Sequence, residues 1–136
     1  MRNKVRDEIF DYVRDTYNTI PEYLWEKTPD AAVLRHLSNK KWYAVIMNVK
    51  KDRLGLKGNG TIDIIDLKCE PEMIGSLVQK DGFFRAYHMN KEKWLTVVLD
   101  GTVPNEEIIT LIDLSFELTD TKINTSRTTD NKIVND

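Results

Sequence analysis

Apolar positions recur along this chain with two different periods, and the changes between them predict where helices and strands lie. In residues 3–17, Val5, Ile9, Tyr12 and Val13 fall at helical spacing among charged residues, which predicts an amphipathic helix. Two prolines bracket the irregular connection that follows, because a residue before proline is disfavoured in the α region. We expect the tryptophan inside this connection, Trp25, to cover the core.

Three segments in the middle of the chain are candidate strands. Residues 42–49 (WYAVIMNV) are apolar at almost every position, which predicts a strand with both faces at least partly covered. Residues 61–69 (TIDIIDLKC) predict a second strand after a polar, glycine-containing link. Residues 31–37 fit either a strand or a helical turn, and their periodicity does not decide between the two.

Two further helices are indicated by their first turns. Pro71 and Pro104 suit the first turn of a helix, where the missing N–H has no cost. Acidic residues near each proline favour the positive end of the helix dipole. Met73, Ile74, Leu77 and Val78 would form the apolar stripe of the first of these helices. The helix that begins near Pro104 would face the core with Ile108, Leu111, Ile112 and Phe116.

The stretch from Gly82 to Gly101 predicts a β-hairpin between these helices. Residues 83–89 and 94–99 are rich in aromatic and β-branched side chains, and the polar residues 90–93 make a connection of hairpin length. Strict alternation would place on one face Phe84, Ala86 and His88, and on the other Phe83, Arg85, Tyr87 and Met89. Gly101 ends the second strand, since glycine adopts positive φ without steric cost.

The predicted order is helix, the segment 31–37 taken as a strand, two strands, helix, two strands and helix. Short hairpin links make the sheet largely antiparallel, with helices packed on it, so the fold class is α+β. A doubly wound sheet is disfavoured because consecutive strands lack helical crossovers. We expect one domain over residues 1–118 and a polar, flexible C-terminal tail over residues 119–136.

Composition restricts the classes of function. The chain has 136 residues and a formal net charge of −2, so any nucleic-acid site needs a local basic patch. The single cysteine, Cys69, excludes an intrachain disulfide and fits a reducing cytoplasm. The charged N-terminus does not match a signal peptide, and no apolar run approaches the ~20 residues of a membrane span. We therefore expect a cytoplasmic protein that does not associate with membranes.

Several short motifs resemble those of the MmcQ/YjbR family of small bacterial proteins. The resemblance covers roughly residues 25–118 and rests on Arg35-His36, Lys41-Trp42-Tyr43-Ala44, Leu67-Lys68-Cys69-Glu70-Pro71, Ala86-Tyr87-His88-Met89-Asn90-Lys91, Trp94, Leu99-Asp100-Gly101 and Leu111-Ile112 with Ser115. It implies an α-β(3)-α-β(2)-α fold of the secretion-chaperone-like type. It also implies DNA binding by two protruding β-hairpins that act as a double wing, and it supplies no catalytic residues.

Local charge supports a DNA-binding hypothesis. Between residues 40 and 57, six basic residues against Asp52 give a local charge of +5. Such side chains at a hairpin tip contact phosphates or enter a groove. The alternative is that they keep the tip soluble and block edge pairing. The candidate DNA-binding residues of the two hairpins are Lys40, Lys41, Lys50, Lys51, Arg53, Lys57, Arg85, Lys91 and Lys93.

A second hypothesis is a non-enzymatic module that binds a small ligand or a protein through the face around residues 87–91. Its candidate residues are Arg35, Lys68, Tyr87, His88, Asn90 and Trp94. Their alternative role is structural, as sheet aromatics and side chains that satisfy local backbone groups. The apolar strand at 42–49 also suggests a homodimer or a protein partner, if helices cover only one face.

Catalysis and cofactor binding are not expected. His36, His88 and Cys69 lack the CxxC or HxxxH spacings that identify metal or nucleophile sites. Cys69 precedes a predicted helix, whose N-terminus would stabilise a thiolate, but such a cysteine is more often a small buried apolar residue. The sequence therefore predicts no enzyme, no metal and no cofactor.

Overall fold

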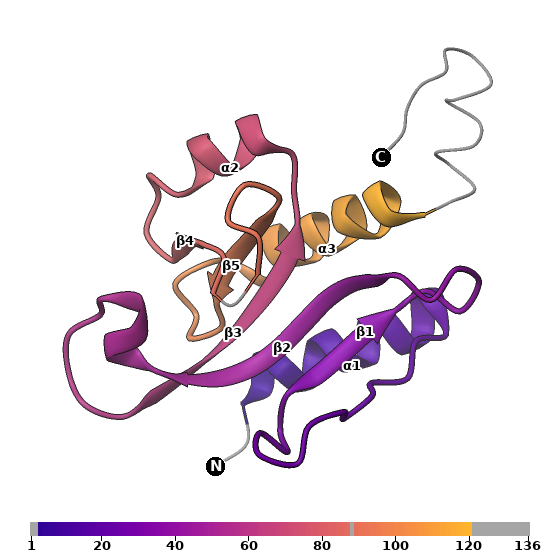
Figure 1. Ribbon diagram of the computed structural model, residues 1–136, viewed down its shortest axis with the longest axis horizontal. Helices are drawn as coiled ribbons and strands as arrows, with labels where there is room; N and C mark the ends of the chain where they lie inside the picture. The colour runs from indigo at the N-terminus through magenta and orange to yellow at the C-terminus, as the bar shows by residue number, and fades with distance from the viewer. Residues whose placement is uncertain (1–2, 88, 121–136) are drawn as a thin grey trace.

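Helices and strands alternate in the order that the sequence predicts. The computed structural model describes residues 3–87 and 89–120 (Figure 1). Its elements are α1 (Lys4–Tyr17), β1 (Ala32–Arg35), β2 (Trp42–Lys50), the 3-10 helix η1 (Lys51–Leu54), β3 (Thr61–Lys68), α2 (Pro71–Leu77), β4 (Phe83–Arg85), β5 (Trp94–Val98) and α3 (Asn105–Thr119). The α-β(3)-α-β(2)-α prediction is confirmed, and the ambiguous segment 31–37 contains a strand.

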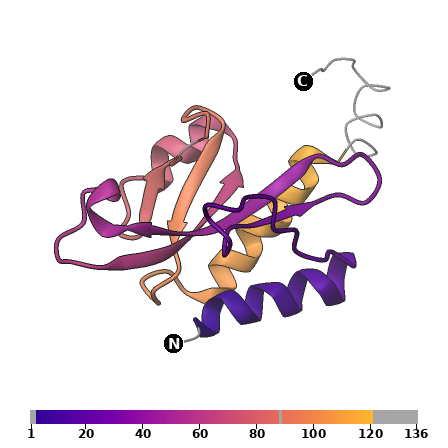
Figure 2. The same ribbon diagram turned by 60° about the horizontal axis from the view of Figure 1, so that its bottom comes forward.

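The five strands form one antiparallel sheet in the order β1-β2-β3-β5-β4. Helices α1 and α3 lie side by side on one face of this sheet, as Figures 1 and 2 show from two directions. Alternation along the strands turns fully buried apolar side chains toward these helices. The core between sheet and helices includes Ile9, Val13, Ile65, Leu67, Leu95, Val97, Ile108 and Ile112.

The other face of the sheet, here called the open face, is partly covered by connecting segments. Val49, Ile62, Ile64 and Val98 form a second apolar cluster there, packed under Leu54 and Leu56 of the β2–β3 connection and under Phe84 and Tyr87. Val45, also on this face, is 1% exposed. These open-face residues are therefore covered within the chain, whereas Trp42 of β2 is partly exposed, and a homodimer or protein partner stays a prediction.

A β-bulge at the start of β2 decides which aromatic residues face the helices. Leu34 lies opposite Ala44 but Arg35 lies opposite Trp42, so Tyr43 is an extra residue on β2. Tyr43 and Ala44 consequently both belong to the core on the helix side. The Tyr43 hydroxyl lies 2.6 Å from Thr19 Oγ1. The indole of Trp42 is left on the open face.

The second hairpin is shorter than the sequence pattern suggests. β4 ends at Arg85 and β5 begins at Trp94, so the prediction of a strand through residue 89 is wrong. Side-chain bonds replace the strand pairing: Thr96 Oγ1 accepts a bond from the Tyr87 N–H, and Lys91 Nζ donates to the Ala86 carbonyl. His88, a predicted ligand-binding residue, lies outside the described residues.

Neither edge of the sheet is a long free strand. Beyond β1, Glu22 forms a bridge with Val33, and the Glu22 carboxylate accepts two hydrogen bonds of 2.9 and 2.7 Å from Arg35. At the other edge, β4 has only three residues. Trp25, expected to cover the core, instead packs edge-on against Trp42, with a ring-centroid distance of 5.8 Å, and is 38% exposed.

The last helix of the fold overlaps the predicted tail by one residue. α3 includes Thr119, the first residue of the segment 119–136, and residues 121–136 lie outside the described part of the chain. In residues 3–87 and 89–120, none of the helices has the length and apolar character needed to cross a membrane.

Candidate nucleic-acid interface

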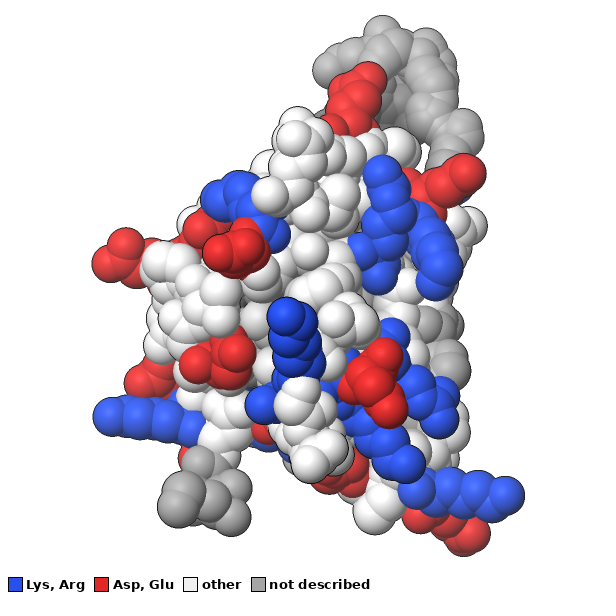
Figure 3. Space-filling model, turned by 90° about the vertical axis from the view of Figure 1, so that its left-hand side faces the viewer, with Lys and Arg blue, Asp and Glu red and all other residues white. Residues whose placement is uncertain are grey.

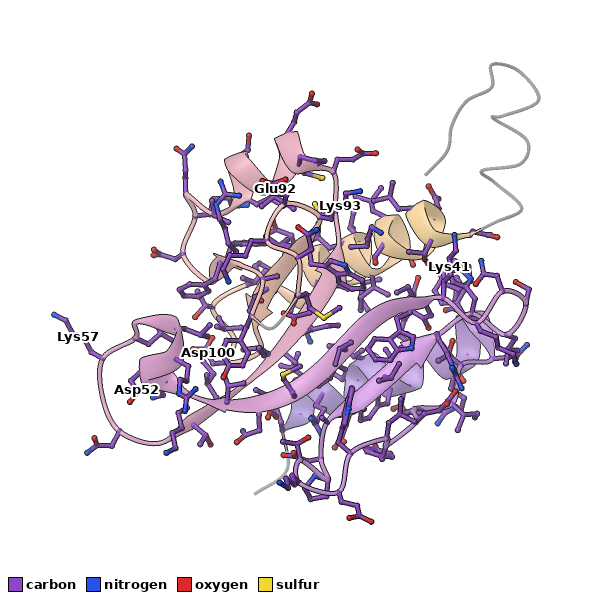
Figure 4. The ribbon with its side chains drawn as sticks, viewed as in Figure 1. Lys41, Asp52, Lys57, Glu92, Lys93 and Asp100 are labelled. Atoms are coloured by element: carbon purple, nitrogen blue, oxygen red, sulfur yellow. The ribbon has the colours of Figure 1, made fainter. Side chains whose placement is uncertain are left out.

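The predicted basic residues fall into two groups at opposite ends of the sheet. β2 and β3 are antiparallel partners that run from Trp42 to Lys50 and from Thr61 to Lys68. A nine-residue strand is roughly 25–30 Å long, which separates Lys41, before β2, from the residues after it. Figure 4 shows Lys41 and Lys57 at these two ends. The charge of +5 that the sequence places in one stretch is therefore divided.

The first group, here called the tip, is the connection between β2 and β3. Residues 50–60 carry four basic side chains and one acidic one, a net charge of +3. Lys51, the first residue of η1, donates its N–H to the Gly60 carbonyl, and its own carbonyl accepts a hydrogen bond from the Leu56 N–H. Together with the packing of Leu54 and Leu56 on the sheet, these bonds give the tip a defined shape. The tip presents Lys50, Lys51, Arg53 and Lys57 against Asp52.

Figure 3 looks onto the side of the molecule that carries the tip. Lys and Arg side chains gather toward one side of this view, with Asp and Glu side chains among them. In Figure 4, Lys57 extends away from the ribbon with Asp52 near it on the same connection, whereas Glu92 and Lys93 of the second hairpin are labelled in another part of the molecule. The two hairpins therefore do not combine into one uninterrupted basic surface.

The second group, here called the basic end, lies where β2 begins, β3 ends and β5 begins. These ends meet because the three strands are antiparallel neighbours. The exposed residues Lys40, Lys41 and Lys93 contribute cations there, and Glu92 beside Lys93 opposes them (Figure 4). Arg85 is at the same end, but it pairs with Leu95, so its side chain alternates to the helix side.

Four side chains from four strands form a row across the open face at this end. Arg35 lies opposite Trp42, and Lys68 lies opposite Trp94. All four are partly exposed. Lys68 Nζ is 5.8 Å from the centroid of the Trp94 ring, a cation–π contact. We call Arg35, Trp42, Lys68 and Trp94 the cross-sheet row.

The row unites three of the six residues predicted for ligand binding and adds one that sequence reasoning missed. Arg35, Lys68 and Trp94 were predicted, whereas Trp42 was assigned to a strand and to a family motif but to no site. The other described candidates have local structural roles. Asn90 Oδ1 accepts a bond from the Glu92 N–H within the connection, and Tyr87 packs on the open-face apolar cluster.

A buried carboxylate next to the row is a second residue that sequence reasoning missed. Asp66 shares the open face with Lys68 and is 0% exposed. The Thr96 hydroxyl donates to Asp66 Oδ1, and Oδ2 has no hydrogen-bond partner among the described residues. Burial raises the pKa of Asp66 to about 7, against smaller lowering effects of Thr96 and the Lys91 charge. The sequence did contain a signal for the burial of Asp66, because alternation within TIDIIDLKC puts it on the same face as Ile62 and Ile64.

His36, one of the residues considered for catalysis, is held by contacts within the core. His36 Nε2 lies 2.8 Å from Thr119 Oγ1, and burial lowers the pKa of this histidine. Its ring contacts Tyr43 and Phe116. No cluster of three or more His, Cys, Asp or Glu that could hold a metal ion is present in residues 3–87 and 89–120.

Cys69 is expected to react slowly with alkylating agents. It is 6% exposed, and burial raises the pKa of its thiol to about 11. Relative to the ordinary value of 9.0, this leaves on the order of 100-fold less thiolate at neutral pH. Mass spectrometry of the native chain with iodoacetamide at pH 7.5 measures the rate, with the urea-unfolded chain as control. Equal rates in the two states would contradict the burial argument.

A pocket of about 150 Å³ lies between the start of α2 and α3, on the side of the sheet away from the row. Its lining is mostly apolar and includes Leu67, Met73, Leu111 and Leu118. This volume is below the ~300–1,000 Å³ of ordinary small-molecule sites. Of the predicted ligand residues, only Lys68 touches it.

Comparisons of this chain with family models, known proteins and solved structures agree with one another. The YjbR family model matches residues 14–118. The chain is 51% identical over 114 residues to the uncharacterized protein YyaQ of Bacillus subtilis (strain 168), covering 84% of this chain and 97% of YyaQ. A crystal structure of a Pseudomonas syringae protein is similar with a TM-score of 0.82 and 48% identity, over 85% of this chain and 98% of that one. A Deinococcus radiodurans protein, 24% identical over 88% of this chain and 85% of its own, shares the fold with a TM-score of 0.61.

Proposed function

This chain belongs to the YjbR family, and from the charges on its own surface we propose that it binds DNA without catalysing a reaction. The observation that carries the proposal is the tip, which concentrates a net charge of +3 in eleven residues of a chain whose total is −2. The basic end adds exposed lysines at the opposite end of the sheet. Each hairpin acts as a separate wing.

The tip is suited to duplex phosphates. Three of its cations, Lys50, Arg53 and Lys57, are exposed. The 3-10 helix η1 and the apolar contacts of the tip hold its backbone in place. Binding therefore needs to order mainly the long side chains. Lysine and arginine at such a protrusion displace counterions from the phosphate backbone, and this gives affinity that does not depend on sequence.

Neutralising the tip is expected to weaken duplex binding and its dependence on salt. In the double variant Arg53→Gln/Lys57→Gln, the slope of log K against log salt should fall by roughly 2, because each lost phosphate contact removes about 0.9. Fluorescence anisotropy of a labelled 20-base-pair duplex between 20 and 200 mM salt measures both quantities.

The matched control is Lys4→Gln/Lys27→Gln, which removes the same charge from exposed positions outside the tip. Its slope should equal that of the unaltered chain. If the two double variants lower affinity equally, the tip has no special role. If the unaltered chain does not bind duplex at 20 mM salt, the proposal fails.

The second candidate is a module that binds a small ligand or a protein through the face around residues 87–91. The observation in its favour is Asp66, whose Oδ2 has no hydrogen-bond partner among the described residues and lies next to this connection. Asp66 is 0% exposed, so a ligand reaches Oδ2 only if the side chains that cover it move aside. A ligand that then donates a hydrogen bond to Oδ2 would raise the melting temperature of the chain but not that of Asp66→Asn. The effect would depend little on salt, which distinguishes it from phosphate binding.

A further inference from the structure

We propose that the cross-sheet row binds unpaired nucleobases, so that the open face accepts single-stranded nucleic acid. This site is separate from the tip, and it requires no duplex. The inference rests on the position of two indole rings and one ammonium group, on their exposure, and on the lysines that surround them.

The two tryptophans of the row are spaced for neighbouring bases. Trp42 is on β2 and Trp94 on β5, with β3 between them, so two strand spacings of roughly 10 Å in total separate their backbones. Lys68 is on β3, the strand between β2 and β5, and its Nζ lies 5.8 Å from the Trp94 centroid. A base stacked on each indole would bring the intervening phosphate near this ammonium group.

The tryptophans of the row differ from the aromatic residues of the core. Tyr17, Tyr43 and Phe116 pack against one another on the helix side, with Tyr17 and Phe116 stacked at a centroid distance of 3.7 Å. Trp42 and Trp94 belong to neither apolar cluster and are partly exposed. Accessible indoles beside cations are the arrangement on which proteins stack bases without regard to sequence, and the partly exposed rings of Trp42 and Trp94 resemble it.

The surrounding charges favour a polyanion over a neutral aromatic ligand. Lys40 and Lys41 directly precede Trp42, and Lys93 directly precedes Trp94, and all three are exposed. The guanidinium of Arg35 is held by Glu22, so the row's net attraction comes chiefly from the lysines. Glu92 opposes them, as do the exposed Glu70 and Glu117, which line the same pocket as Lys68. This predicts moderate affinity with a strong dependence on salt.

Intrinsic fluorescence reports on this site directly. The chain has three tryptophans, of which Trp42 and Trp94 are in the row and Trp25 contacts Trp42. Titration with the unstructured oligonucleotide dT12 at 20 mM salt should quench the emission as bases stack on the indoles. Raising the salt should weaken binding with a slope of about −0.7 for each phosphate contacted.

Variants separate stacking from simple attraction to phosphates. Trp94→Ala should weaken dT12 binding by about 5- to 150-fold, and Trp94→Phe should retain most of the affinity, because a phenyl ring still offers a stacking face. Lys68→Gln should lower both the affinity and the salt slope. Thermal unfolding of each variant monitors folding, and if Trp94→Ala does not fold, Trp94→Phe with Lys68→Gln provides the test through fluorescence anisotropy of labelled dT12.

The two variants distinguish a failure of this inference from a failure of duplex binding. Arg53→Gln/Lys57→Gln should bind dT12 as the unaltered chain does, and Trp94→Ala should bind duplex as the unaltered chain does. Equal affinity of Trp94→Ala and the unaltered chain for dT12, or no quenching at 20 mM salt, overturns the stacking site whatever the tip variant shows. Loss of dT12 binding in the tip variant alone would assign single strands to the tip and likewise overturn it.

Discussion

Replacing Asp66 by asparagine is expected to remove a contribution that makes this protein less stable as the pH rises. Burial raises the pKa of Asp66 from an ordinary 3.8 to about 7 in the folded state. Below pH 3.8 the carboxyl is protonated in both states and contributes no difference. Between these pKa values only the unfolded state ionises, so the free energy of unfolding falls by about 1.4 kcal/mol per pH unit. Above pH 7 the loss is complete, at about 4 kcal/mol.

Urea unfolding at intervals between pH 4 and pH 8 measures this contribution as a difference between Asp66→Asn and the unaltered chain. The difference in unfolding free energy should rise with pH and reach a plateau above pH 7. Groups common to both chains cancel in it. Asp52→Asn, at an exposed position on the tip, is the matched control and should follow the unaltered chain. A difference that does not change with pH would mean that Asp66 ionises normally in the folded protein.

Replacing Gly82 by alanine is expected to cost about 2–4 kcal/mol of stability, through backbone strain and overlap together. Gly82 has φ of +92°, and a Cβ there would lie 2.7 Å from Val103 Cγ2 and 3.1 Å from Thr102 Cγ2. Val103 is 2% exposed and belongs to the core, so it has little room to move. The Gly82 carbonyl also accepts a 3.0 Å bond from the Val98 N–H, which ties the β4 side of the hairpin to β5.

Gly101 provides the matched control for this substitution. Its φ is +96°, almost the same as that of Gly82, but nothing lies within 4 Å of an added Cβ. Gly101→Ala should therefore show backbone strain alone, about 1–2 kcal/mol. Urea unfolding at pH 7 gives both values. If the two variants lose equal stability, the contact with Val103 has relaxed and the overlap contributes nothing.

The sequence predicted the order of the elements because most strands here carry a clear apolar pattern and end at glycine or charged residues. The segment 31–37 was ambiguous for a physical reason. Residues 31–34 are all buried, so the alternation that distinguishes a strand is missing. The positive φ of Gly101 was predictable from its turn chemistry, whereas the overlap at Gly82 depends on Val103, twenty-one residues away in the chain.

The candidate site was harder to predict than the fold. Lys41 and Lys50 are close in sequence, but the nine-residue strand that begins after Lys41 and ends at Lys50 carries them to opposite ends of the sheet. The cross-sheet row was hidden for the opposite reason, since it joins residues up to fifty-nine positions apart. The bulge at Tyr43 adds a local irregularity that shifts the faces of its neighbours, and periodicity alone does not reveal it.

The outer strands have a consequence for how the molecules behave at high concentration. Many sheets can recruit a strand from a neighbour through unpaired amide and carbonyl groups at an edge, which is the first step toward fibrils. Here one edge strand, β1, is bridged by Glu22, whose carboxylate accepts two hydrogen bonds from Arg35. The other edge strand, β4, has only three residues. Aggregation by strand addition is therefore disfavoured, even though the sheet is rich in isoleucine and valine.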